Sequence, residues 1–286
     1  HYHTNVQGER IANSEYIDSS FYTDAPKQHH APQKTMLTSY VPTKGKIKIP
    51  VILVNFSDLH FTIDNPIAQF DDLFNVSGGS NKHATGSVRD YFIASPDSAL
   101  ILEYDVFGPF TLSQPMAYYG SNKQSEQNIT NHNTRAKELV KEAAELAIQN
   151  NIDLSPYDND NDGYIDNISI VVAGYNEAEG GHEDAIWPHY SVISNSPLYS
   201  NKYLSGYLII SEYRSSGGKE QAGIGTYCHE FGHALGLPDL YNTNNSEAYT
   251  VGEWDIMCSG SYNNNGSTPP SFTAFERFMM GWLTPI

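Results

Sequence analysis

The sequence predicts an α/β domain built on a twisted, mixed but mostly parallel sheet with helices packed against it. Runs of β-branched residues alternate with amphipathic segments along the chain, which is typical of layered α/β folds. The first of these runs is apolar at nearly every position, as in a strand that is buried on both faces. The chain of 286 residues is also long enough to bury a sizeable core without disulfide bonds.

Four strands are expected in chain order. Residues 49–56 form the apolar run, and residues 102–109 form a second strand that ends at a Gly-Pro pair. Residues 167–173 and 207–211 are two further apolar runs of strand length. Because helical segments separate them, these strands are expected to lie mostly parallel.

Four helices are expected between and after the strands. Residues 87–93 can open a helix at a serine, and residues 134–150 show the clearest amphipathic pattern. A helix over about 221–235 is followed by a Gly/Asn-rich stretch. The last predicted helix begins near Pro269 and carries apolar residues as far as Trp282.

Residues 1–45 differ from the rest and are expected to form an N-terminal arm or a pro-segment in front of a catalytic domain over residues 46–286. They contain prolines and histidines but no sustained apolar period. Asp18, Asp24 and His29 are candidates to reach an active site from this segment, whereas a cysteine switch is excluded. Since the sequence begins with neither Met nor an apolar leader, we expect a processed or trimmed chain.

The charge balance excludes several classes of protein. The chain has 33 acidic and 16 basic residues and a net charge of −17, so it lacks the basic surface that nucleic acids and anionic membranes require. No apolar run approaches the roughly 20 residues of a membrane-spanning helix. Two cysteines rule out a disulfide scaffold and a four-cysteine zinc cluster. This composition suits a secreted or cell-surface protein, expected as a monomer.

The strongest chemical signal is the segment from Cys228 to Asp239, which contains His229, Glu230 and His233. Histidines four residues apart project from the same face of a helix, so both imidazoles can reach one ion. Gly236 can end the helix in a left-handed turn, after which the chain reverses. Asp239 can then supply a third ligand. Two imidazoles and one carboxylate leave the fourth zinc position for water, as a catalytic site requires.

An acidic loop follows the helix predicted over 134–150. Asp158, Asp160, Asp162 and Asp166 stand at positions 1, 3, 5 and 9 of an EF-hand-type pattern, with glycine at position 6. Tyr164 would offer its carbonyl at position 7, and the usual Glu of position 12 is replaced by a serine. We expect at least one structural calcium ion here; the alternative is a solvated Asp/Asn/Gly turn.

The zinc segment resembles the elongated motif of the metzincin metallopeptidases, in the variant that ends in Asp. Residues 254–260, Trp-Asp-Ile-Met-Cys-Ser-Gly, resemble their Met-turn. Together the two segments are most similar to the immune inhibitor A-like peptidases. Residues 50–56, 86–92, 186–189 and 280–283 agree with this resemblance. It covers about residues 46–286.

The resemblance implies a metzincin-like catalytic domain with one catalytic zinc ion, an active-site helix and Met257 beneath the metal. It carries the third ligand over to Asp239. In this clan a tyrosine often assists the developing oxyanion, and Tyr262 is the nearest candidate, although its spacing from the methionine departs from the clan's pattern. Tyr262 as an ordinary packing residue is the alternative.

Two further pairs are left open. Cys228 and Cys258 both flank the expected chemistry, so they form either a disulfide or two buried free thiols. His182 and His189 flank Trp187 and serve either a second metal or structural hydrogen bonds.

The expected function is a secreted zinc endopeptidase that cuts internal bonds of proteins or peptides. Glu230 can act as the general base toward a zinc-bound water and later pass the proton to the leaving amine. Two alternatives remain: a calcium-stabilised binding or adhesion module without turnover, and a zinc amidase that acts on a non-protein substrate.

Overall fold

The computed structural model describes most of the chain. The described residues are 2–4, 10–12, 41–78, 85–95, 98–125, 128–131, 135–215, 219–242 and 250–284. The candidates from the N-terminal segment, Asp18, Asp24 and His29, lie outside this part of the chain.

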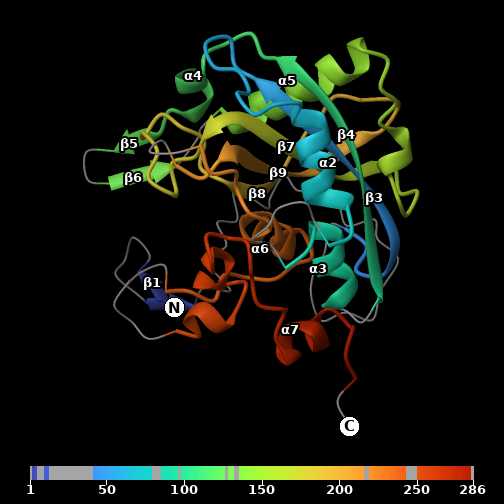
Figure 1. Ribbon diagram of the computed structural model, residues 1–286, viewed down its shortest axis with the longest axis vertical. Coiled ribbons are helices and arrows are strands. Elements are labelled where there is room, and N and C mark those ends of the chain that lie inside the picture. The colour runs from blue at the N-terminus through green and yellow to red at the C-terminus, as the bar shows by residue number, and fades with distance from the viewer. Residues whose placement is uncertain are drawn as a thin grey trace.

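The fold is α/β, as predicted, and its centre is a five-stranded sheet (Figure 1). The strand order is β4 (Leu100–Thr111), β3 (Gly45–Asn55), β7 (Tyr164–Tyr175), β9 (Tyr203–Tyr213) and β8 (His189–Val192). The first four strands pair in parallel, and β8 pairs antiparallel with β9 at one edge. The sheet is therefore mixed and mostly parallel.

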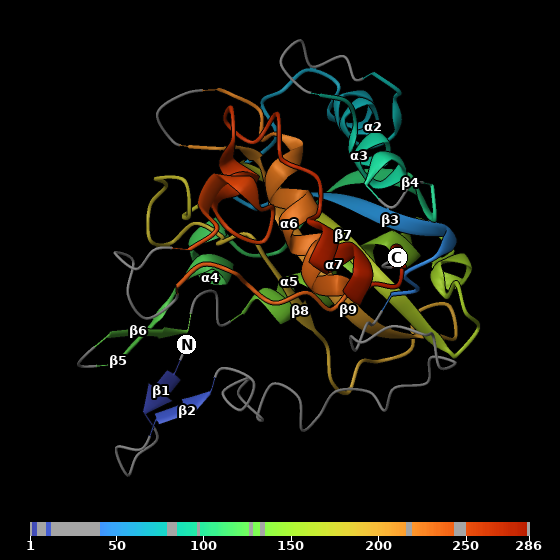
Figure 2. The ribbon, with the colours of Figure 1, turned by 90° about the horizontal axis from the view of Figure 1, so that it is seen from below.

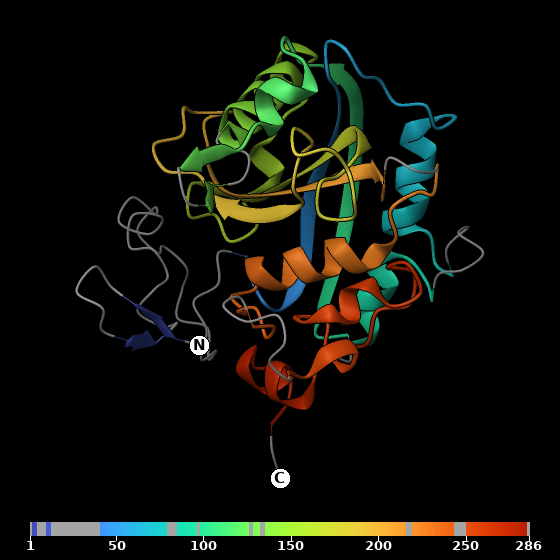
Figure 3. The ribbon, with the colours of Figure 1, turned by 90° about the vertical axis from the view of Figure 1, so that its left-hand side faces the viewer.

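One face of the sheet is covered by α2 (Pro66–Asn75), α3 (Val88–Ala94) and α6 (Ile224–Ala234), which share a buried apolar cluster with it. The other face is covered by α4 (Met116–Gly120) and α5 (Ala136–Gln149). Figure 3 shows the layers, with α6 in orange below the sheet and α5 in green above it. The apolar residues that alternate along β3 divide between the two cores, since Val51 and Leu53 join the first and Ile52 joins the second.

The C-terminal part of the chain forms a further layer beneath α6. It contains the short helices η2 (Gly252–Trp254), η3 (Ser259–Tyr262) and α7 (Ala274–Met279). Figure 2, seen from below, shows α7 directly over α6. Close packing fixes this layer, because a Cβ atom on Gly225 of α6 would lie 2.0 Å from the carbonyl oxygen of Ser261. The segment after α6 is thereby held against the helix that carries the zinc motif.

The remaining described elements are short. Two small antiparallel pairs are formed by β1 (Tyr2–Thr4) with β2 (Arg10–Ala12) and by β5 (Lys123–Ser125) with β6 (Asn128–Asn131). A single turn, η1 (Ser155–Tyr157), precedes the acidic loop. Within the part of the chain that the structure describes, each helix is too short or too polar to cross a bilayer.

The predicted strands and helices are present, with shifted ends. The strands are longer than expected, whereas the last helix spans only Ala274–Met279 and not the whole stretch from Pro269 to Trp282. The shorter helix follows from its N-cap, where Thr273 and Glu276 form a capping box that starts the helix after the two prolines. The helices α2 and α4 and the short polar edge strand β8 were not predicted from the sequence.

The domain boundary expected between residues 45 and 46 falls inside β3. Val41 and Thr43 are already buried, and the indole of Trp282 donates to the Thr43 carbonyl. Residues 41–45 therefore pack as part of the main domain, because the segment that leads into β3 is hydrogen-bonded to Trp282.

Candidate metal centre

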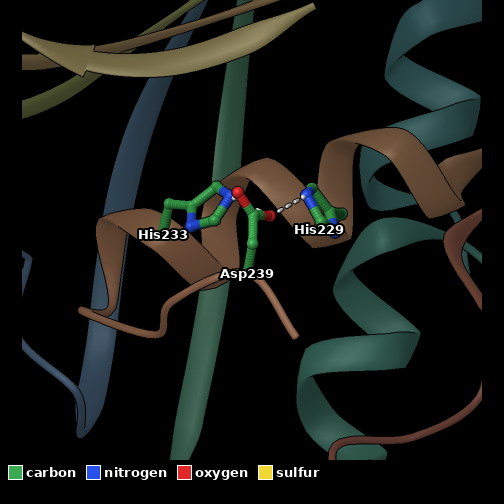
Figure 4. A group of neighbouring side chains, drawn as sticks. All are labelled: His229, His233 and Asp239. Carbon is green, nitrogen blue, oxygen red and sulfur yellow. Dashed lines mark ion pairs between the residues drawn. The ribbon is translucent and has the colours of Figure 1, made fainter. Parts of the chain in front are cut away.

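Two histidines and one aspartate converge below the sheet. His229 and His233 project from the same side of α6, and Asp239 reaches them from the chain that follows the helix (Figure 4). The Oδ1 atom of Asp239 lies 3.2 Å from the Nε2 atom of each histidine. The residues predicted as zinc ligands are thus brought together at one point.

The hydrogen bonds behind the two rings define which atoms face this point. The Nδ1 atom of His229 lies 2.8 Å from the Ile256 carbonyl oxygen, and that of His233 lies 2.8 Å from the Leu237 carbonyl oxygen. A carbonyl can only accept, so each Nδ1 carries a hydrogen. In the neutral rings, both Nε2 lone pairs then point at Asp239. Backbone carbonyls commonly orient metal-binding histidines in this way.

The donor set fits a divalent cation. Asp239 Oδ1 is buried and has no ordinary hydrogen-bond donor among the described residues. Burial opposes the charge of Asp239, but the two histidines outweigh it and hold its pKa well below the usual range. The pKa of His229 is lowered by burial, yet Asp239 and Glu230 raise it overall to about 9. The site therefore favours positive charge, and one ion shared by two nitrogens and an oxygen suits zinc.

The turn after α6 explains how Asp239 reaches the histidines. Gly236 has a φ of +96°, and the amide of Leu237 donates to the carbonyl of Gly232, 3.0 Å away. This left-handed end reverses the chain, as predicted for Gly236. The amide of Leu240 then donates to the Met257 carbonyl, so the ligand-bearing loop is tied to the segment around Met257.

Met257 is fully buried beneath α6. A Cβ atom on Gly232 would lie 2.5 Å from its sulfur, so a larger residue at position 232 would force the Met257 side chain to shift. The preceding residue, Ile256, provides the carbonyl that holds the His229 ring. Met257 therefore packs against α6 at Gly232, and its place beneath a metal ion stays a prediction.

Glu230 lies on α6 between the two histidines and is mostly buried. Its Oε2 atom accepts a hydrogen bond of 2.8 Å from the amide of Tyr190 in the edge strand β8. Burial raises the pKa of this carboxyl group, although His229 and His233 oppose the shift. A carboxylate that is held in place beside the ligands, with a raised pKa, has the properties of a general base.

A pocket with a volume of about 260 Å³ opens beside His229 and Glu230. Its wall is partly aromatic and includes Trp187, Tyr241 and Tyr262. The predicted Tyr262 therefore does face the candidate centre. Burial raises its pKa to about 12, so the phenol stays protonated and can donate a hydrogen bond at neutral pH.

Sequence reasoning missed Tyr241. Its ring stacks on His229 with a centroid distance of 6.4 Å, and its hydroxyl group lies near the Asp239 carboxylate. Burial, reinforced by Asp239, raises the pKa of this phenol well above its usual value. The signal was its position two residues after the third ligand, but among 20 tyrosines that position did not single it out.

The acidic loop brings together three of the predicted calcium ligands. Carboxylate oxygens of Asp158, Asp160 and Asp162 lie within 4.8 Å of one another. The loop is bent by Gly163, which has a φ of +97°. Tyr164 is the first residue of β7.

Asp166 is placed differently from the other three acids. Its Oδ2 atom accepts from the side-chain amide of Asn159, 2.7 Å away, and it is not part of the cluster. The cluster also includes a cation that was not anticipated, since the Lys202 Nζ atom lies 2.6 Å from Oδ2 of Asp158.

The two open pairs are resolved by the geometry. Cys228 and Cys258 are both buried free thiols. His189 makes structural hydrogen bonds, to the Trp187 carbonyl at 2.7 Å and to the Tyr207 hydroxyl at 3.0 Å. His182 is exposed and lies 3.4 Å from a carboxylate oxygen of Asp184.

Comparison with known proteins gives a consistent picture. The family model described as immune inhibitor A peptidase M6, catalytic domain, matches residues 35–283. The pre-pro-metalloprotease PrtV of Vibrio cholerae serotype O1 (strain M66-2) is 30% identical over 280 residues, which cover 83% of this chain and 30% of the relative. Immune inhibitor A of Bacillus thuringiensis subsp. alesti is 26% identical over 274 residues, or 80% of this chain and 38% of the relative.

Among solved structures, metalloproteinase-II from Bacteroides fragilis is similar with a TM-score of 0.38 and 14% identity, covering 85% of this chain and 54% of that chain. The chain thus spans about a third of the length of the curated relatives it matches, since the matched part is 30% of one and 38% of the other.

Proposed function

The chain belongs to the immune inhibitor A family of M6 peptidases, whose catalytic-domain model it matches over residues 35–283, and on that premise we propose that it is a zinc endopeptidase. The observation that carries the proposal is the convergence of His229, His233 and Asp239 with Glu230 beside them. His229, His233 and Asp239 would hold the metal, in keeping with the elongated zinc motif of the metzincins.

When zinc is bound, it supplies Lewis acidity toward the substrate carbonyl and lowers the pKa of a bound water. The chain's own residues do the rest. The amide of Tyr190 holds the Glu230 carboxylate, which takes the proton from the attacking water and passes it to the leaving amine. The carbonyls of Ile256 and Leu237 keep the two imidazoles in the tautomer that binds metal.

The surroundings of the centre support a polypeptide substrate. The aromatic pocket beside Glu230 can take one large side chain. The strand β8 lies at the edge of the sheet and contacts α6, so an extended segment of substrate can run along it. Both features fit a peptidase better than a hydrolase for a small amide.

The test is to incubate the purified, zinc-loaded chain with reduced, unfolded protein substrates and to identify the new termini by mass spectrometry. Cleavage at internal bonds, abolished by a zinc chelator and restored by zinc, is expected. A chain that holds one zinc ion and cuts none of these substrates would remove the peptidase proposal and favour a binding module.

The two tyrosines of the pocket are proposed to have different roles. Tyr262→Phe is expected to lower kcat by about 100-fold without changing zinc affinity, because it removes a donor for the developing oxyanion. Tyr241→Phe is expected to weaken zinc binding about 10-fold, because it removes the hydroxyl group that orients Asp239. Steady-state kinetics and a zinc-competition titration measure the two effects. If neither variant differs from wild type, both roles are wrong.

The acidic loop is proposed to bind one structural calcium ion. The closeness of Asp158, Asp160 and Asp162 supports this, because the three carboxylates repel one another and Lys202 supplies only one positive charge against them. The carbonyl of Tyr164 is a further proposed ligand. Asp166 would have to turn from Asn159 to join them, and Lys202 would have to leave Asp158.

Calcium at about 100 times its Kd is expected to raise the free energy of unfolding by about 2.7 kcal/mol, seen as an increase in Tm. Lys202→Gln provides the matched comparison, because it removes the competing ammonium group from Asp158. We expect a larger calcium-induced increase in this variant than in the wild type. If calcium leaves the Tm of both proteins unchanged, the loop is an acidic turn that Lys202 stabilises.

Secretion, a monomeric state and removal of an N-terminal pro-segment are also proposed. The name of the Vibrio relative describes a pre-pro-protein, and the composition of the residues before Val41 is consistent with such a segment. Secretion is further supported by the two relatives, an immune inhibitor and a pre-pro-metalloprotease.

A further inference from the structure

Two buried carboxyl groups, those of Asp255 and Glu276, meet beside the Met257 segment. Asp255 is 1% exposed and Glu276 of α7 is 2% exposed. Their side chains lie within hydrogen-bonding reach of each other. Two carboxyl groups in a buried contact cannot both be ionised without a large free-energy cost, so one of the two is expected to be protonated.

The hydrogen bonds of the pair show where the proton belongs. Oδ1 of Asp255 accepts from the amide of Met257, 2.7 Å away. Oε2 of Glu276 accepts from the amide and the hydroxyl group of Thr273, at 2.7 and 2.9 Å. The other oxygen of Glu276, Oε1, is buried and lacks a donor among the described residues. A proton on Oε1, donated to Asp255, satisfies this atom and leaves every other bond in place.

The ionisable neighbours do not replace that proton. Tyr91 of α3 faces both acids, but its hydroxyl group donates to the Pro270 carbonyl. Cys228 of α6 faces Tyr91 and is a buried thiol. His229 acts on Asp255 from α6, but its ring is held between Ile256 and Asp239. On α7, Arg277 is adjacent to Glu276, and adjacent helical residues point in different directions.

The environment agrees with a neutral Glu276. Burial raises the pKa of Glu276 to about 7, with a further contribution from the charge of Asp255 and with the bonds from Thr273 opposing. Burial also raises the pKa of Asp255, against the opposing bond from the Met257 amide. Glu276 therefore carries the proton and Asp255 the charge.

The pair is connected to the metal centre through the backbone. The carbonyl of Asp255 accepts from the amides of Cys258 and Gly260, both at 3.1 Å, so Asp255 holds the whole turn. The next residue, Ile256, orients the His229 ring through its carbonyl. We propose that Glu276 is a positioning residue for the zinc centre: its neutral carboxyl group donates to Asp255 and thereby fixes the Met257 turn and the His229 ring.

The part of this proposal that concerns turnover rests on the peptidase function, whereas the parts that concern stability and zinc retention do not. Since the pKa of Glu276 in the folded chain is above its unfolded value, its stabilising contribution is complete below the unfolded pKa. It is lost as the pH rises through the folded value of about 7. Above that pH the two acids repel each other and the turn should loosen.

The experiment compares three variants of the zinc-loaded chain. Glu276→Gln keeps a permanent donor to Asp255 and an acceptor for Thr273. Asp255→Asn keeps the acceptor for Met257 and removes one charge. Glu276→Ala removes the bridge. Tm is measured from about pH 5 to pH 9, the carboxylic-acid C=O stretch is recorded by infrared difference spectroscopy, and zinc release, kcat and KM are measured.

We expect the Tm of the wild type to fall relative to that of both amide variants as the pH rises through about 7. The carboxylic-acid band is expected to be weaker in Glu276→Gln than in the wild type, whereas Asp166, whose pKa burial raises to about 8, contributes to the band of both proteins. Glu276→Ala is expected to release zinc about 10-fold faster and to lower kcat about 10-fold at constant KM, while Glu276→Gln restores both values.

Parallel Tm–pH curves for the wild type and Glu276→Gln, or carboxylic-acid bands of equal intensity in the two proteins, would overturn the proposal. These two measurements remain decisive if Glu276→Ala fails to fold or if the chain cuts no peptide. A normal pH response without any peptidase activity would reject the proposed function and leave the role of Glu276 in the metal centre standing.

Discussion

Replacing Glu230 with Gln is expected to lower kcat by about 10²–10⁴-fold while the chain still binds one zinc ion, because the change removes the proposed general base and little else. The carbonyl oxygen of the Gln side chain can still accept from the Tyr190 amide, so the contact between α6 and β8 survives. The new side chain cannot take a proton from water at neutral pH. The measurement is kcat on a fluorogenic peptide, together with the zinc content of the purified variant.

Glu253→Gln is the matched control for this variant. Glu253 is exposed in η2 and lies close to the Met257 segment in the chain. Its replacement by Gln removes one negative charge, as Glu230→Gln does. Its kcat is expected to equal that of the wild type. If Glu230→Gln cuts the peptide as fast as Glu253→Gln, the base has been assigned to the wrong residue, even though the metal assignment would stand.

The fold was predictable where a long segment showed one clear spacing of apolar residues, either that of a strand or that of a helix. The apolar run of β3 and the amphipathic stripe of α5 each specify an element by themselves, and both were found with ends shifted by a few residues. The edge strand β8 was not predictable, since His189–Val192 is short, polar and half-exposed. It is a strand because β9 offers it hydrogen bonds, which is a tertiary effect that the local sequence does not encode.

The site was predictable for a different reason. His229, Glu230 and His233 lie on one helix, so their relative positions follow from helical geometry alone. Asp239 also follows, because Gly236 restricts how the chain can turn. By contrast, the contacts from Tyr241 and Tyr190 depend on how loops and β8 dock on α6, and no spacing in the sequence reveals them.

The contacts of the buried acidic residues were also not predictable from the sequence. Glu276 is 21 residues beyond Asp255 in the sequence, and its capping role at Thr273 is visible there as a Thr-x-x-Glu pattern. That pattern accounts for the hydrogen bonds of only one carboxylate oxygen of Glu276. Its contact with Asp255, like that of Lys202 with Asp158, arises from packing between elements. Periodicity predicts which face of an element is apolar, but it does not predict which buried polar groups meet.

Removing zinc is expected to lower the Tm by an amount on the order of 10 °C and to abolish turnover. If free zinc was about 1,000 times its Kd, its loss costs about 4.1 kcal/mol of folding free energy, and a chain of this size loses about 2–4 °C per kcal/mol. The structural reason is that two Nε2 atoms and Oδ1 of Asp239 converge within 3.2 Å, and without a cation or added protons their lone pairs repel. The measurement is a thermal melt with a chelator and after zinc is returned.

The control for that melt distinguishes zinc at this centre from zinc bound elsewhere. In His233→Ala one of the three proposed ligands is absent, so the chelator should change the Tm by much less than in the wild type, and added zinc should restore little. In His182→Ala, which removes an exposed histidine outside the centre, the chelator should lower the Tm as far as it does in the wild type. If His233→Ala responds to zinc as fully as His182→Ala does, the stabilising ion is bound elsewhere, and α6 with Asp239 is not the metal centre.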